Sequence, residues 1–198
     1  MTPPRRVLLT GLTGLLALAA GCTPPPPGYP ASLPPDAVQG AGDPTRAAIV
    51  TAAGVFGDPA SVAGNPVSAA RAVAMYEYLA VEIPTGPRWR EFSPLVGPEL
   101  VEGRAELRAA LGIAPDAPPQ EVIDRLFAAS RALQAGDVAA AERILSPPVF
   151  VPGGRPLIER LAALPFLPKV SFAANRTQQE MIRVDQQGRF RGGGGMRF

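Results

Sequence analysis

The stretch NPVSAARAVAMYEYLAVEIPTG, residues 65–86, decides the fold class of this chain. It opens with Asn65-Pro66, which places a capping side chain before a proline at the first helical position, where the missing N–H costs nothing. Pro84 and Gly86 end the pattern. Between them, apolar residues recur at helical spacing along one face: Val67, Ala70, Ala74, Tyr78 and Val81. The spacing predicts a well buried helix.

Helix signals recur after residue 43, whereas strand signals are scarce. Asp43-Pro44 repeats the cap, and Asp58-Pro59 opens a short turn. Apolar spacing predicts further helices over 99–111, from 118 to about 135, and over 138–145, 157–164 and 171–186. The predicted fold class is therefore all-α: a small irregular helical bundle of about five to six helices on a disordered Pro-rich tether.

Gly136-Asp137 predicts a helical hairpin, because it ends one helix and caps the next. Residues 128–145 resemble the turn between the helices of tetratricopeptide-like repeats. A repeat array needs about three copies at a period of ~34 residues. The sequence holds no second copy, and so it predicts a single hairpin.

The first 21 residues have the three parts of an export signal: a basic start at Arg5 and Arg6, an apolar run over 7–20, and small residues before a cleavage point. The apolar run is shorter than the ~20 residues that span a bilayer. No other stretch reaches that length without charge. We therefore expect no transmembrane helix after processing. The paired arginines leave the general and the twin-arginine export routes open.

The segment Leu18-Ala19-Ala20-Gly21-Cys22 resembles the lipobox of bacterial lipoproteins. The resemblance covers the first 22 residues, and Ala19 stands where leucine is most common. It implies cleavage between Gly21 and Cys22 and attachment of acyl chains such as palmitate to Cys22, the only cysteine. Thr23 stands where aspartate marks retention in the inner membrane of enterobacteria, which favours the outer membrane. The alternatives are an ordinary cleaved signal or a retained N-terminal anchor.

Four segments follow from this organisation: a signal peptide over 1–21, a Pro-rich tether over 22–42, a helical domain over 43–187 and a disordered Gly-rich tail over 188–198. A fully extended tether would let the domain stand up to roughly 60 Å from the bilayer, at about 3.1 Å per residue.

Charge and composition exclude several functions. Without Arg5 and Arg6 the chain carries 17 basic and 17 acidic side chains, which removes the electrostatic case for nucleic acid. The sequence contains no histidine, and its one cysteine is assigned to lipid. Serine and cysteine triads, thiol chemistry and a Cys/His zinc site are therefore excluded. We predict no metal, no cofactor and no enzymatic activity.

Paired carboxylates are the one catalytic apparatus left open, as in glycoside hydrolases acting on the envelope. The carboxylates nearest to aromatic residues are Glu77, Glu82, Glu91 and Glu99. Acidic side chains on helix surfaces ordinarily serve solubility, and so a carboxylate-dependent envelope hydrolase ranks as the second alternative.

The cluster Arg88-Trp89-Arg90-Glu91-Phe92 holds the only tryptophan, at a junction between two predicted helices. Tryptophan and arginine are enriched at binding hot spots, so the cluster is a candidate partner contact. The competing interpretation is that Trp89 and Phe92 fill the core while Arg88 and Arg90 face water.

We expect a membrane-anchored periplasmic lipoprotein that is a structural or protein-interaction component of the envelope. A binding module for a small apolar or envelope-derived ligand is the first alternative.

Overall fold

The computed structural model describes residues 31–38 and 42–192 of the chain. This part is all-α, as predicted, with seven α-helices, two short 3-10 helices and no strand. The predicted signal peptide, with its predicted cleavage point at Gly21 and Cys22, and residues 22–30 of the predicted tether lie outside the described residues.

Helix α2, Pro66–Thr85, forms the centre of the fold. The Asn65 side chain caps it by accepting from the N–H of Ser68 at 3.0 Å. Buried side chains occur on all sides of α2, which is why the sequence of this helix is apolar almost throughout. Tyr76 and Tyr78 are both buried in the core.

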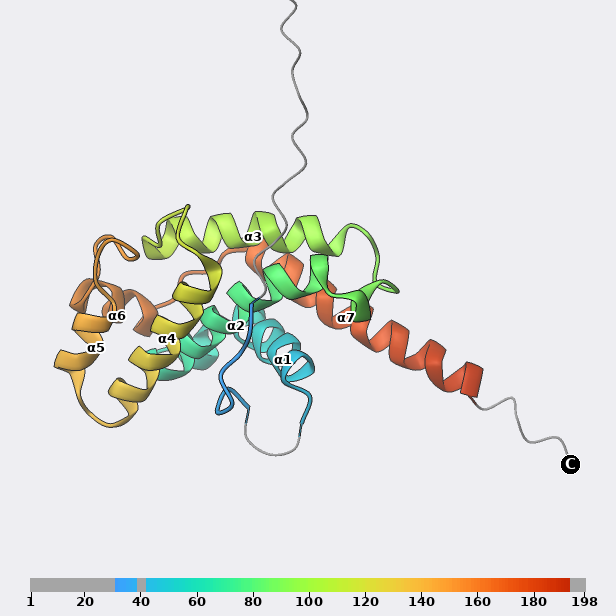
Figure 1. The fold of residues 1–198 in the computed structure, drawn as a ribbon, viewed down its shortest axis with the longest axis horizontal. Helices are drawn as coiled ribbons and strands as arrows, with labels where there is room; N and C mark the ends of the chain where they lie inside the picture. Colours follow the sequence, from blue (N-terminus) through green and yellow to red (C-terminus); the bar gives the residue numbers. More distant parts are fainter. Residues whose placement is uncertain (1–30, 39–41, 193–198) are drawn as a thin grey trace, which may run out of the picture.

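The other α-helices that the structure describes are α1 (Pro44–Gly57), α3 (Val96–Leu111), α4 (Pro119–Gln134), α5 (Val138–Ile144), α6 (Arg155–Ala162) and α7 (Pro168–Gly192). Helix α2 contacts α1, α3, α4 and α6, and α7 packs on α1 and α3. Figure 1 shows α3 along one edge of the molecule, with α4, α5 and α6 gathered at one end and α7 extending beyond the opposite end. One continuous hydrophobic core joins these elements.

The local signals of the sequence act as predicted. Asp43 caps α1, Asp58 caps the 3-10 helix η1 (Pro59–Val62), and Asp137 caps α5. Gly112 ends α3 with a φ of 69°, in the left-handed region that favours glycine. Helices α4 and α5 pack against each other across the short turn at Gly136, which confirms the single hairpin.

Three predictions need correction. The described residues hold seven α-helices instead of five to six, because the segment after Asp43 also forms a full helix. Helix α7 runs to Gly192, so residues 188–192 of the predicted disordered tail are helical. The remainder of that tail, 193–198, lies outside the described residues. The predicted disorder of the tether is also wrong for residues 31–38, which pack on the domain.

Residues 31–38, here called the docked segment, pack against the domain although they belong to the predicted disordered tether. Ala37 is buried, and Leu33 and Val38 are partly buried against the core. The segment is held because its polar groups form hydrogen bonds with side chains of α2 and α4. Burial of apolar side chains and these polar contacts together offset the entropy lost by ordering.

Asp36 supplies the main polar contact of the docked segment. Its carboxylate accepts two hydrogen bonds from the guanidinium of Arg131 on α4, at 2.5 and 2.7 Å. Arg71 on α2 donates to the carbonyl oxygens of Asp36 and Ala37. At the other end, the Ser32 N–H donates to the Gln120 side chain at 2.7 Å. The segment therefore spans α4 from its first turn to its last.

Within the described part of the chain, no helix is both long and apolar enough to cross a bilayer.

Candidate functional site

Residues 86–95, here called the junction loop, connect α2 to α3 and carry the Arg88-Trp89-Arg90-Glu91-Phe92 cluster. The loop contains the 3-10 helix η2, Pro87–Trp89. It begins at Gly86, whose N–H donates to the Glu82 carbonyl at 2.7 Å. A Cβ at Gly86 would lie 2.6 Å from that oxygen and 2.9 Å from the Trp89 ring. Only glycine therefore allows the chain to turn this tightly over the indole.

Trp89 and Phe92 turn inward from the junction loop. They are 6% and 8% exposed, and their rings meet edge to face with centroids 5.1 Å apart. The indole Nε1–H donates to the carboxylate of Glu82 at 3.0 Å, which satisfies the polar atom of an otherwise buried side chain. The core-filling interpretation of the two aromatic residues is confirmed.

The two arginines of the cluster face outward but differ in their partners. The Arg88 guanidinium lies 4.7 Å from the centre of the Trp89 ring and forms an ion pair with Asp43, the N-cap of α1. Although burial opposes it, this guanidinium, with the N–H groups of Arg46 and Thr45, holds the pKa of Asp43 below its usual value. Arg90 is exposed and has no ion pair or hydrogen bond within the described residues.

Helix α7 holds the junction loop from the opposite side. The Glu180 carboxylate accepts from the Ser93 N–H at 2.8 Å, and Arg183 donates to the Glu91 carbonyl at 2.6 Å. The Arg183 side chain and the Ser93 N–H lower the pKa of Glu180, so this carboxylate stays ionised. The junction loop is thus fixed at both sides by segments far from it in sequence.

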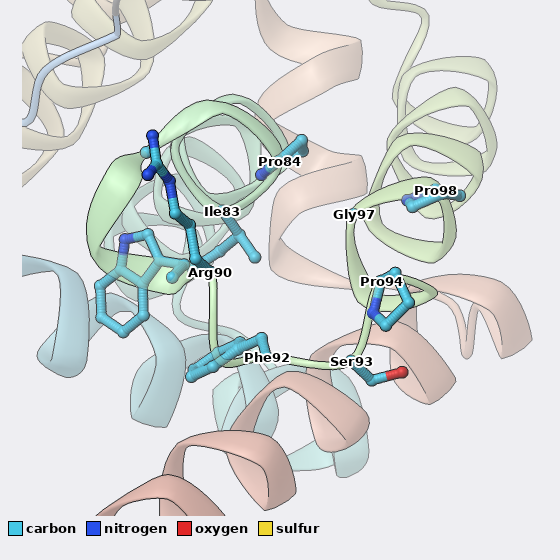
Figure 2. Close-up of a pocket in the computed structure, with 10 residues that line it drawn as sticks. Ile83, Pro84, Arg90, Phe92, Ser93, Pro94, Gly97 and Pro98 are labelled. Carbon is cyan, nitrogen blue, oxygen red and sulfur yellow. The ribbon is translucent and has the colours of Figure 1, made fainter.

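A pocket of about 520 Å³ opens between the end of α2, the junction loop and the start of α3. Figure 2 shows Ile83 and Pro84 facing Gly97 and Pro98 across it, while Arg90 stands on the side opposite to Pro94. A Cβ at Gly97 would lie 3.2 Å from Pro84, so glycine lets the two helix ends approach. The walls are mainly apolar, with Arg90 and Ser93 as the polar contributions. The sequence located the aromatic cluster but gave no sign of this pocket.

Three of the four candidate carboxylates each have a different partner, and the fourth is exposed. Glu77 is fully buried and accepts two hydrogen bonds from Arg108, both at 2.8 Å. Glu82 accepts from Trp89. Glu99 lies 3.3 Å from Arg176, as an ion pair without hydrogen-bond geometry, and Glu91 is exposed. None of the four lines the pocket at the junction loop.

A second feature that the sequence analysis missed lies on α3. Arg104 is half-buried in a cavity of about 300 Å³, and no hydrogen bond or ion pair to its side chain occurs in the described part of the chain. Burial lowers the pKa of Arg104. An arginine between Gly103 and Ala105 has the appearance of an ordinary surface charge, so no sequence signal distinguished it.

No group of three acidic, cysteine or histidine side chains among the described residues is arranged to hold a metal ion. Comparison with protein-family models, curated proteins and solved structures gave no significant match, so every functional assignment depends on the residues of this chain alone.

Proposed function

We propose that this protein is a lipid-anchored component of the bacterial envelope whose helical domain binds a protein partner at the pocket beside the junction loop. The anchor is the acylated Cys22, and the domain stands in the periplasm, with the outer membrane favoured by Thr23. The assignment of the anchor rests on the lipobox resemblance of residues 18–22.

The docked segment changes how far such a domain can stand from the bilayer. Ala31 already belongs to the packed part of the chain. Only the link from Cys22 to Ala31 is left to span the distance, and nine residues reach at most about 30 Å when fully extended. The acylated protein would therefore act close to its membrane, within half of the reach expected from a free tether.

The preformed apolar pocket is the observation that carries the proposal of a protein partner. Its walls come from Ile83, Phe92 and three prolines, so a partner's apolar side chain would replace water there. Arg90 stands at the rim without a partner in the described residues and can pair with a carboxylate of the bound protein. The ion pair of Arg88 with Asp43 and the hydrogen bonds from α7 hold the junction loop in place before binding, which lowers the entropic cost of association.

The anchor is tested by the intact mass of the protein extracted from membranes, compared with a Cys22→Ala variant. We expect a chain that begins at Cys22 and carries added acyl mass, and we expect the variant to lose both this mass and its retention in the membrane fraction. An unprocessed or unacylated chain retained in membranes would refute the anchor.

The pocket is tested by photo-crosslinking in intact cells, with the crosslinking amino acid placed at position 90. We expect a discrete protein adduct that is lost when Pro98→Phe fills the pocket from its exposed edge. The matched control carries the crosslinker at Val50, an exposed position on α1. An adduct that survives Pro98→Phe, or that forms equally from position 50, would contradict the proposed binding site.

The size of the pocket also favours a second candidate, a small apolar ligand. Pockets for small molecules commonly enclose ~300–1,000 Å³ and have apolar walls with few polar groups, and this pocket falls in that range. Trp89 lines the pocket and is the only tryptophan, so its fluorescence reports on the occupant. A small molecule released from the purified protein by denaturation, together with a shift in Trp89 emission, would decide for this candidate.

A further inference from the structure

We propose that the exposed side of α3 formed by Val101, Arg104, Ala105 and Ala109, here called the α3 face, lies on the membrane surface, where Arg104 binds the phosphate of an anionic lipid. This inference rests on the proposed attachment of the chain through Cys22. It assigns an orientation to the domain. It also assigns a lipid class to the cavity lined by Arg104, which is separate from the pocket at the junction loop.

The point where the chain leaves the domain places the α3 face near the anchor. The docked segment begins at the first turn of α4, where Ser32 is bonded to Gln120. The loop before α4 is fixed to the last turn of α3, because Arg108 donates to the carbonyl oxygens of Ala114, Pro115 and Ala117. The C-terminal half of α3 and the start of the docked segment therefore share one end of the domain, and Figure 1 shows α3 along its edge.

The number of residues between Cys22 and Ala31 limits which surfaces can reach the bilayer. With at most about 30 Å between Cys22 and Ala31, the end of the domain that carries Ser32 and Gln120 must stay near the lipid surface. The α3 face adjoins this end. By contrast, α5 begins beside the last turn of α4, directly after the turn at Gly136, so its first residues lie at the far end of α4 from Gln120.

Arg104 gives the α3 face its charge. Its cavity is lined also by Arg108, Ile113 and Pro115, and no carboxylate lines it. Arg108 already donates to Glu77 and to three carbonyl oxygens, whereas Arg104 has no such bond in the described residues. Burial lowers the pKa of Arg104. A phosphate oxygen supplies the acceptor that this guanidinium lacks.

Apolar side chains surround the charge. Val101 is 42% exposed, and Ala105 and Ala109 follow it at helical spacing on the solvent side of α3. The acidic residues on the flank are engaged: Glu102 pairs with Lys169, and Glu106 accepts from the N–H groups of Lys169 and Val170 at the start of α7. Phe172, which shares a cavity with Glu102, is 56% exposed beside this face. An apolar surface with one basic side chain suits the interfacial region of an anionic bilayer.

The test uses the chain from Cys22 onward, coupled through its single thiol to a maleimide lipid in vesicles. The vesicles contain phosphatidylcholine alone or with phosphatidylglycerol. This coupling reproduces the tether whether or not the cell acylates Cys22, so failure of the proposed anchor and failure of this orientation give separate results. A photo-crosslinking amino acid replaces Ala105 or, as the matched control, the exposed Ala139 in the first turn of α5. Lipid adducts are counted by intact mass.

We expect position 105 to crosslink lipid several times more than position 139 in vesicles with phosphatidylglycerol. Arg104→Gln should lower the yield at 105 about fivefold there, as for one basic side chain near an anionic surface, and should have no effect in phosphatidylcholine alone. Val101→Glu should give a similar loss from an exposed position that does not put folding at risk. Equal yields at 105 and 139, or a yield at 105 that either variant leaves unchanged, would overturn the proposal.

Discussion

At the scale of single residues, the buried pair of Glu77 and Arg108 joins three parts of the molecule. The guanidinium binds the carboxylate on α2 and the carbonyl oxygens of the loop that follows α3. Both side chains are nearly inaccessible to water. Such a pair is costly to bury but more costly to break, because removal of one partner leaves a buried charge without compensation.

We therefore expect Glu77→Gln to lower the free energy of unfolding by about 3 kcal/mol. The physical reason is that Arg108 keeps its charge while losing the carboxylate that neutralises it. Urea denaturation followed by circular dichroism measures the change. Glu91→Gln, at an exposed position, is the matched control and should stay within about 0.5 kcal/mol of the parent chain. A loss equal to that of the control would show that the buried pair contributes little.

Gly103 shows a second constraint at this scale, since it lies directly against the Tyr76 hydroxyl. A Cβ at Gly103 would lie 2.0 Å from that oxygen and 3.2 Å from the Cα of Val170. We expect Gly103→Ala to cost about 1–3 kcal/mol of stability. Tyr76→Phe removes the clashing oxygen and should recover part of this cost. A double-mutant cycle measures the recovery, and strictly additive losses would contradict the proposed clash.

At the scale of elements, the docked segment and α7 each form polar contacts with parts of the chain that are distant in sequence. The docked segment binds to α2 and α4 through contacts of Asp36 with Arg71 and Arg131. Helix α7 fastens the junction loop through Glu180 and Arg183. Both sets of contacts depend on a carboxylate, so both should be sensitive to pH or to removal of that charge.

Docking of residues 31–38 should weaken in acid. The hydrogen bonds from Arg131 lower the pKa of Asp36 from 3.8 to about 2. Because the pKa is lower in the docked state, ionised Asp36 stabilises docking fully above about pH 4, and this contribution is lost as the pH falls through about 2. Amide NMR shifts of residues 31–38, followed from neutral pH into acid, should report this transition. Asp36→Asn should lack it; an unchanged transition in that variant would assign it to another group.

Loss of the Glu180 contact between α7 and the junction loop should make the loop more mobile. Glu180→Gln removes the charge that pairs with Arg183 and weakens the acceptor of the Ser93 N–H. We expect Trp89, now 6% exposed, to become more accessible to acrylamide, which quenches tryptophan fluorescence on contact. Glu159→Gln, at an exposed position of α6, is the control. Equal quenching in both variants would mean that the loop holds its shape without α7.

At the scale of the whole molecule, one continuous core connects the junction loop at one end with the α4–α5 hairpin and α6 at the other. We therefore expect the described domain to unfold in a single cooperative transition. Trp89 fluorescence reports on the junction loop, while far-ultraviolet circular dichroism reports on all helices, and the two denaturation curves should coincide. Separate midpoints would show that the two ends unfold independently.

The whole molecule also relates the two proposed surfaces. The α3 face and the pocket both include α3, but the pocket lies at its N-terminal end with Gly97 and Pro98, whereas Arg104 and Ala109 lie further along. Pro98 lies one helical turn before Val101 on the exposed side of α3, so a partner in the pocket and a bilayer under the α3 face would be neighbours.

The sequence by itself determined the helical class and many helix ends, because those depend on contacts within a few residues. Asn65, Asp43 and Asp137 bond N–H groups two or three residues away, and Gly112 adopts its left-handed conformation locally. Tertiary structure alone decided the docking of Asp36, the bonds from α7 to the junction loop and the isolation of Arg104. These partners are 87 to 95 residues apart in the first two cases, and no local pattern encodes which distant side chains will meet.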